Sequence, residues 1–237
     1  MTNIPKTVLH CASAVAVALA VSSAAFAQGI GLEKMSSGHI AGEYTRNILV
    51  ANEKVQVWDV VIRPGETGPM QSREGMFIYH VTGGTLERSF ADGSKQVVTR
   101  KTGEALVVAE KRPYSSKNIG STTIHLISAA FPKDTAMSKT SPGQPAGTMK
   151  VKILSENGKF LARDVIARPG DSSPLQVRPM RVVYFLTGGV FKRVFKDGTQ
   201  TVVYADAGET RLLDVPLPYS LKNIGNSTVH LIEVDIK

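Results

Sequence analysis

The sequence is nearly without cysteine, since Cys11 is the only one in its 237 residues. An apolar run follows Cys11, whereas a lipoprotein anchor needs the apolar run before the cysteine, so we interpret this residue as incidental. It also lies in a segment that we expect to be removed. The remaining chain then has no disulfide, no thiolate nucleophile and no thiolate metal ligand, and its stability must come from packing.

Long apolar stretches are also missing, apart from one near the N-terminus. Residues 11–27 read CASAVAVALAVSSAAFA and follow Lys6. This run is typical of a secretory signal peptide, with Ala25-Phe26-Ala27 as the small-x-small cleavage site. Elsewhere nothing approaches the roughly 18 to 20 apolar residues of a spanning helix, so we expect no membrane span. Cleavage after Ala27 would leave a periplasmic or secreted protein.

Acidic residues are too few to balance the basic ones. The chain has 28 Lys and Arg against 20 Asp and Glu, a net charge of +8 that becomes +7 when Lys6 is removed with residues 1–27. Most charge of this kind belongs to the solvated surface of a protein. A positive net charge also favours contact with anionic small molecules, cell-wall polymers or membrane surfaces. The basic residues are scattered and form no aromatic-laced patch, so nucleic acid is not an expected partner.

What the chain does contain is an internal repeat. Residues 59–127 align without a gap with residues 164–232, and 31 of the 69 pairs are identical. Both copies carry Pro-Gly, Gln-x-Arg, Tyr and Thr-Gly-Gly at one spacing, in PGETGPMQSREGMFIYHVTGG (64–84) and PGDSSPLQVRPMRVVYFLTGG (169–189). The repeat predicts two copies of one structural unit.

Each copy reads as strands joined by tight turns. No long helical period appears after residue 27. Short runs rich in Val, Ile, Tyr and Thr are separated by turn residues, and Asp92-Gly93 and Asp197-Gly198 carry the hairpin signal. In the first copy we expect strands at residues 55–62, 76–81, 85–90, 95–100, 104–109 and 123–131.

The same reading sets the domain boundaries. Residues 28–132 form an N-terminal domain that begins with an arm up to about residue 45, and residues 149–237 form a C-terminal domain. Between them, residues 133–148 are rich in Pro, Gly, Ser and Thr and form a linker. An arm of this kind often covers a neighbouring sheet or subunit, so assembly of the chain into a homo-oligomer stays an open alternative.

At the turns and pocket positions each copy resembles a cupin, and the whole chain resembles a bicupin. The first cupin motif is a Gly, five residues and His-x-His; here five residues separate Gly65 from Gln71-Ser72-Arg73 and Gly170 from Gln176-Val177-Arg178. The second motif has a Gly, then Pro-His and an Asn, and this chain has Gly103, Pro113-Tyr114 and Asn118, repeated as Gly208, Pro218-Tyr219 and Asn223. The resemblance implies an all-β fold of two tandem cupin barrels of the jelly-roll (double-stranded β-helix) type.

The departure from that family lies in its metal ligands. A metal-binding cupin uses three His and one Glu, and the His places here hold Gln, Arg and Tyr in both copies. The place of the Glu depends on the register: it falls on Met76 and Arg181, or on Phe77 and Val182, and no choice supplies a carboxylate. Because an arginine keeps its proton and its positive charge, it repels a cation. We therefore expect no metal and no other cofactor in either barrel.

The exchanged residues instead suit a small anionic or sugar-like ligand. Side chains two apart on a strand share one face, and in the cupin register the Gln-x-Arg face looks into the barrel toward the Tyr. A guanidinium fork, an amide and a phenol can bind a carboxylate, a phosphate or a sugar acid. We favour the second copy, where Arg181 adds a cation. The predicted ligand-binding residues are Gln71, Arg73, Tyr114, Gln176, Arg178, Arg181 and Tyr219.

Two alternatives stay open. In the first, the barrels are filled and the protein is a structural or interaction body, with Arg73 paired to Glu74 or Asp59. In the second, the protein is a metal-independent isomerase or lyase in which Tyr114 and Tyr219 act as acids with the help of the arginines. The sequence favours binding over catalysis.

The enzyme alternative needs a base, and the histidines are few. Past residue 27 the chain has His39 in the arm, His80, and the repeated pair His125 and His230. His80 faces inward only in the Met76 register and is replaced by Phe in the second copy, while the repeated pair is expected to be structural. Because Gly-x-Ser-x-Gly, P-loop and His-Glu-x-x-His motifs are also missing, we assign no catalytic residue.

Overall fold

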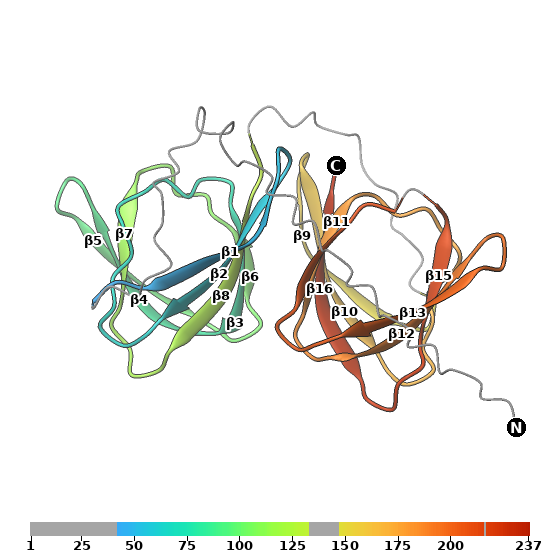
Figure 1. Cartoon of the computed structure of the whole chain (residues 1–237). Coiled ribbons are helices and arrows are strands. Elements are labelled where there is room, and N and C mark those ends of the chain that lie inside the picture. The colour runs from blue at the N-terminus through green and yellow to red at the C-terminus, as the bar shows by residue number, and fades with distance from the viewer. Residues whose placement is uncertain (1–41, 133–146, 216) are drawn as a thin grey trace, which may run out of the picture. The chain divides into compact units, whose positions relative to one another are not determined.

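The computed structural model describes residues 42–132, 147–215 and 217–237. The predicted signal peptide, most of the predicted arm and residues 133–146 of the predicted linker lie outside these residues. Every regular element in the described part of the chain is a β-strand, as Figure 1 shows. No helix among the described residues is long and apolar enough to cross a membrane.

Eight antiparallel strands form the first copy, which we call barrel 1. A five-stranded sheet has the order β1-β2-β8-β3-β6, and a three-stranded sheet has the order β5-β4-β7. The strands are β1 (Thr45–Ala51), β2 (Gln56–Ile62), β3 (Phe77–Thr82), β4 (Gly84–Phe90), β5 (Lys95–Arg100), β6 (Ala105–Val107), β7 (Tyr114–Asn118) and β8 (Ile124–Ala130).

The second copy, barrel 2, repeats this arrangement strand by strand. Its sheets have the orders β9-β10-β16-β11-β14 and β13-β12-β15. Since β1 and β9 also lie 105 residues apart, the structural repeat begins before the identities at residue 59. The strands are β9 (Lys150–Glu156), β10 (Phe160–Ala167), β11 (Arg181–Phe185), β12 (Gly189–Phe195), β13 (Gln200–Ala205), β14 (Thr210–Leu213), β15 (Tyr219–Asn223) and β16 (Val229–Ile236). The predicted all-β class is confirmed.

The two sheets of each barrel enclose an apolar core. In barrel 1, Trp58 and Val60 of the larger sheet pack with Leu86 and Phe90 of the smaller one. In barrel 2 the corresponding core joins residues of β10, β11 and β16 to residues of β12 and β13. Strand alternation explains this, because every second residue of β2 and β10 points between the sheets.

The other face of the larger sheets is buried as well. A further apolar cluster contains Val57, Phe77 and Tyr79 from barrel 1 together with Phe160 and residues of β11 and β16 from barrel 2. The rings of Phe77 and Phe160 meet edge to face with their centroids 5.5 Å apart. Tyr79 and its repeat partner Tyr184 belong to this cluster, so these two recurring tyrosines pack outside the barrels.

The recurring turn residues have local structural roles. Gly65 and Gly170 adopt φ of +84° and +87°, a region that strains any side chain with a Cβ. Asn118 is fully buried, and its amide nitrogen donates to the carbonyl oxygens of Ile62 and Thr122. Asn223 repeats these bonds in barrel 2. These residues fix the loops that lead into each barrel.

Candidate functional site

The Gln-x-Arg segments lie just before β3 and β11, outside the regular strands. Gln71 forms a single bridge with Tyr114 at the start of β7, and Gln176 forms the same bridge with Tyr219. The prediction of a regular strand at Gln-x-Arg is therefore wrong. The predicted common face is right, because the Gln and the Arg of each copy line the same cavity.

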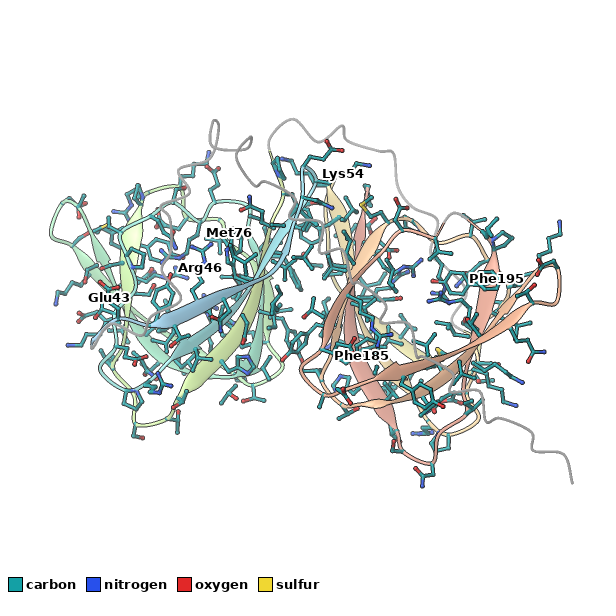
Figure 2. The ribbon with its side chains drawn as sticks, in the orientation of Figure 1. Glu43, Arg46, Lys54, Met76, Phe185 and Phe195 are labelled. Atoms are coloured by element: carbon teal, nitrogen blue, oxygen red, sulfur yellow. The ribbon has the colours of Figure 1, made fainter. Side chains whose placement is uncertain are left out.

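Barrel 1 encloses a cavity of about 60 Å³. The predicted residues Gln71, Arg73 and Tyr114 all line it, together with apolar side chains of β2, β3 and β8. Arg46 and Met76, labelled in Figure 2, also contribute to its wall. The sequence pattern thus brings together its three residues in barrel 1.

Main-chain oxygens hold Arg73 in this cavity. Its Nη1 donates to the carbonyl oxygen of Tyr114 at 2.6 Å and to that of Gln71 at 3.3 Å, and its Nη2 donates to the carbonyl oxygen of Pro69 at 3.3 Å. Asp59, which with Glu74 was one of two partners offered by the filled-barrel alternative, instead bonds to His125 at 2.5 Å. Among the described residues no carboxylate lies within 4 Å of Arg73, so its positive charge is not neutralised locally.

Further basic residues surround the same cavity. The guanidinium carbons of Arg73 and Arg88 lie 4.6 and 4.7 Å from the centroid of the Tyr114 ring. Arg88 also donates to the amide oxygen of Gln96 at 3.4 Å. Arg100 lines the cavity but forms an ion pair with Glu104 at 2.8 Å. The cavity wall is strongly cationic.

His80 lies in the wall of the barrel 1 cavity in its neutral form. Burial lowers its pKa; the backbone and side chain of Glu104 oppose this, whereas the charges of Arg100 and Arg88 lower the pKa further. Its Nδ1 lies 3.2 Å from the carbonyl oxygen of Glu104. His80 therefore adds a neutral ring to this cationic wall near pH 7.

Barrel 2 encloses a similar cavity of about 70 Å³. The predicted residues Gln176, Arg178 and Tyr219 line it. Arg178 is 7% exposed and donates from Nη2 to the hydroxyl of Ser173 at 2.6 Å. Its guanidinium carbon lies 5.4 Å from the centroid of the Tyr219 ring, and that of Arg193 lies 4.7 Å away.

The wall of this second cavity includes an acidic residue, Glu233. Glu233 of β16 lies 3.8 Å from Nη1 of Arg178 and 3.5 Å from Nη2 of Arg163. Arg181 donates to the same carboxylate at 3.0 Å. Burial acts to raise the pKa of Glu233, but the charges of Arg181, Arg163 and Arg178 outweigh it and lower the pKa, which keeps Glu233 ionised at neutral pH.

Asp235 extends this buried charge cluster. It accepts a hydrogen bond from Arg163 and lies 3.9 Å from Nη1 of Arg181. Burial and the neighbouring charge of Glu233 raise the pKa of Asp235 to about 6, against the opposing effect of the two arginines. Arg181 is almost completely buried in this cluster and is not among the residues that line the cavity.

Several buried polar atoms of barrel 2 have no hydrogen-bond partner among the described residues. Four belong to side chains that line the cavity and three to residues that do not line it, and no such atom is found in the described part of barrel 1. Buried polar groups are nearly always satisfied by protein, water or a ligand. The four are the Nε atoms of Arg163, Arg178 and Arg193 and the Oε1 atom of Gln176.

The structure also fixes the register left open by the sequence. Met76 lines the barrel 1 cavity, whereas Phe77 packs in the cluster outside the barrels. Arg181 shares the face of Val183 and Phe185, which line the barrel 2 cavity. The inward positions are therefore those of Met76 and Arg181, and His80 faces inward as this register requires.

Comparison with solved structures gives the fold family. The chain superimposes on an oxalate decarboxylase from Lactobacillus farciminis in complex with formate with a TM-score of 0.60, at 14% identity over 83% of this chain and 82% of that one. The bicupin fold is thereby assigned. AerE from Microcystis aeruginosa gives 0.59 at 14% identity, covering 88% of this chain and 95% of that chain. A cupin 2 conserved barrel domain protein from Leptotrichia buccalis gives 0.51 at 15% identity, covering 82% and 89%. No family model and no curated protein matches.

The metal site of metal-binding cupins does not fit the residues of this chain. In the described part of the chain no three His, Cys, Asp or Glu side chains lie close enough to hold a metal ion. The inward positions carry an amide, a guanidinium and a phenol in each barrel, and a guanidinium cannot lose its proton to become a ligand. These donors suit an anion better than a cation.

Some residues of the bicupin cavities were missed in the sequence. Arg88 and Arg193 recur at the repeat spacing, and this recurrence was the signal that could have found them. Arg163 and Glu233 have no charged counterpart in the other copy, where Trp58 and Ser128 stand. Their signal was the presence of charges within strands that are mostly apolar, which is rare unless the charges are paired.

Proposed function

We propose that this bicupin is an exported protein that binds a small anionic ligand, such as a hydroxy acid or sugar acid, in metal-free barrels. One observation carries the proposal: around the barrel 2 cavity the buried Nε atoms of Arg163, Arg178 and Arg193 have no acceptor among the residues that the structure describes. An unsatisfied buried donor costs about 1–3 kcal/mol, so an anion that accepts from these atoms gains affinity.

The size of the cavities supports a small ligand. They measure about 60 and 70 Å³, whereas one water occupies about 10–15 Å³ on this measure. Each cavity therefore has room for several waters or for a ligand of a few carbon atoms. This room argues against the alternative of filled barrels.

The arrangement of the donors supports a carboxylate or another oxyanion. Arg178 is buried, and Ser173 fixes its orientation. A fixed guanidinium binds a planar carboxylate with little further loss of side-chain freedom. In barrel 2 the amide oxygen of Gln176 has no donor within the described part of the chain, and a hydroxyl on the ligand would supply one.

A thermal unfolding screen tests the proposal. Sugar acids, hydroxy acids, dicarboxylates and phosphates are added to the mature protein, with oxalate included because it is named for fold relatives. A ligand at 100 times its Kd stabilises by about 2.7 kcal/mol, a rise of several degrees in Tm. Arg178→Ala should lose the rise produced by a barrel 2 ligand, while Arg168→Ala, at an exposed turn, should keep it. A panel without any stabilising anion contradicts the proposal.

Export has its own test. The full chain is expressed in a bacterium with a secretion pathway, and the N-terminus of the recovered protein is sequenced. The proposal expects a mature chain that begins at Gln28. Recovery of the uncleaved chain from the cytoplasm alone would contradict it.

A further inference from the structure

Ser128 and Glu233 occupy the same place in the two barrels. They lie 105 residues apart, on β8 and β16, and each lines the cavity of its own barrel. Ser128 stands opposite Trp58 of β2, and Glu233 stands opposite Arg163 of β10. Among the described residues that line the two cavities Glu233 is the only acid, so the cavities differ in negative charge at this position.

In barrel 2 this position supplies a negative charge. The carboxylate of Glu233 contacts Arg163, Arg178 and Arg181 and stays ionised, so it offsets part of the positive charge that a ligand meets. A second anionic group on the ligand would lie within a few ångströms of Glu233. Repulsion between like charges at that separation in a partly dehydrated site should weaken binding by more than about tenfold.

In barrel 1 the same position is neutral. Ser128 is buried, and the described residues that line this cavity include no Asp or Glu. Arg73 and Arg88 lie on the Tyr114 ring, and within the described residues no carboxylate is within 4 Å of either guanidinium. Two anionic groups of one ligand can each face an arginine here without opposing a protein carboxylate.

We infer that the residue at this position sets the ligand charge of each barrel. Barrel 1, with Ser128, selects a small dicarboxylate dianion, and barrel 2, with Glu233, selects a small monocarboxylate. This division rests on the proposed function, since it assigns two ligand classes to the proposed anion sites. It also explains why a duplicated chain keeps Gln, Arg and Tyr in both copies yet differs at 128 and 233.

The chain carries a built-in probe for barrel 1. Trp58 is the only tryptophan of the chain and lies in the barrel 1 core. The guanidinium carbon of Arg46, which lines the cavity, lies 3.9 Å from the centroid of the Trp58 ring. The emission of Trp58 should respond to occupancy of barrel 1 and not of barrel 2. Calorimetry reports both barrels, so the two signals together assign each binding event.

The experiment titrates mature protein with malonate and with lactate at pH 7.5 and low ionic strength, where screening is weak. We expect malonate to change Trp58 emission and to bind barrel 1 more than about tenfold more tightly than lactate does. Lactate should bind by calorimetry without changing Trp58 emission. Malonate should not displace it.

Matched variants isolate the charge from the size of the side chain. Ser128→Asp should weaken malonate binding in barrel 1 by more than about tenfold, whereas Ser128→Asn, which has nearly the same shape, should weaken it far less. Glu233→Gln should add a second malonate site that leaves Trp58 emission unchanged. Thermal unfolding of each variant checks that it is folded.

The outcomes separate the two claims. The charge division is overturned if Ser128→Asp and Ser128→Asn lose the same malonate affinity. It is also overturned if the affinity ratio of malonate to lactate is the same in both barrels. Either result leaves anion binding intact. If neither these probes nor any anion of the wider panel binds, the proposed function fails and the division falls with it.

Discussion

Nη1 of Arg73 donates to the carbonyl oxygen of Tyr114 at 2.6 Å, whereas Nη1 of its repeat partner Arg178 lies 3.8 Å from the carboxylate of Glu233. The same residue in the same place is thus held by the main chain in one barrel and beside an acid in the other. The bicupin fold preserves the position of the guanidinium in both copies. The surroundings determine how much of its charge is left for a ligand.

Replacing Arg73 by Ala should destabilise barrel 1. The change removes charge-assisted bonds to Tyr114, Gln71 and Pro69, and we expect the free energy of unfolding to fall by about 2–3 kcal/mol. Urea denaturation measures this. Arg168→Ala, at an exposed turn, is the matched control and should cost less than about 0.5 kcal/mol. Equal effects of the two changes would show that the main-chain bonds of Arg73 contribute nothing.

The fold was predictable because its signals are local and doubled. Val, Ile and Tyr runs with Asp-Gly turns predict strands and hairpins, and Gly93 closes the turn between β4 and β5 as expected. Repetition separated these signals from chance, since Gly65 and Gly170 take the same positive φ. The loop conformation of Gln-x-Arg was not predictable, because its bridge to Tyr114 joins residues far apart in the sequence.

Gly65→Ala tests the turn that leads into the barrel 1 site. The backbone there has φ of +84°, and an added Cβ meets no heavy atom within 4 Å, so strain in the backbone is the expected cost. We expect a loss of about 1–2 kcal/mol in the free energy of unfolding. Gly120→Ala is a useful comparison because Gly120 does not have positive φ. A Gly65→Ala protein as stable as the wild type would contradict this account of the turn.

The buried cluster of barrel 2 makes stability depend on pH. Asp235 has an ordinary pKa of 3.8 that rises to about 6 in the folded protein. Between these values the folded chain keeps a proton that the unfolded chain has lost, so the free energy of unfolding should fall as pH rises from about 4 to about 6 and level off above. Glu233, whose pKa is lowered, acts in the opposite direction and only below its ordinary value of 4.5.

Asp235→Asn isolates this effect. The amide does not titrate, so the fall between about pH 4.5 and 6 should be smaller in the variant than in the wild type. At pH 7 the variant should lose little stability, because Arg163 keeps Glu233 as a partner and the raised pKa of Asp235 means that the folded protein disfavours its ionised form. Urea denaturation in small pH steps measures both. Identical slopes in the two proteins would mean that Asp235 is not the group that titrates.

The cavities were only partly predictable. The sequence identified Gln71, Arg73 and Tyr114 through a family motif whose spacing survives although its ligands are exchanged. It missed the pairing of Arg181 with Glu233, because the two residues are 52 positions apart and only β11–β16 pairing brings them together. Long-range pairing of single, unrepeated charges leaves no pattern in one sequence.

Metal analysis tests the exchanged ligands. Protein purified without chelators should hold far less than one equivalent of any transition metal, and EDTA should leave its Tm unchanged, because Arg73 and Arg178 cannot act as ligands. The double change of Gln71 and Arg73 to His is the informative control, since it restores part of the cupin motif and should raise zinc uptake. A stoichiometric metal in the wild type would contradict this expectation.

Calorimetric titration of the mature wild type and of the Arg73→Ala/Arg178→Ala double variant tests whether the two arginines bind an anion inside the barrels. The titrant is the strongest anion from the thermal screen, and circular dichroism confirms that the variant is folded. We expect saturable binding to the wild type and a loss of more than about tenfold in affinity in the double variant. Unchanged binding in the double variant, or no saturable binding of any anion to the wild type, would contradict it.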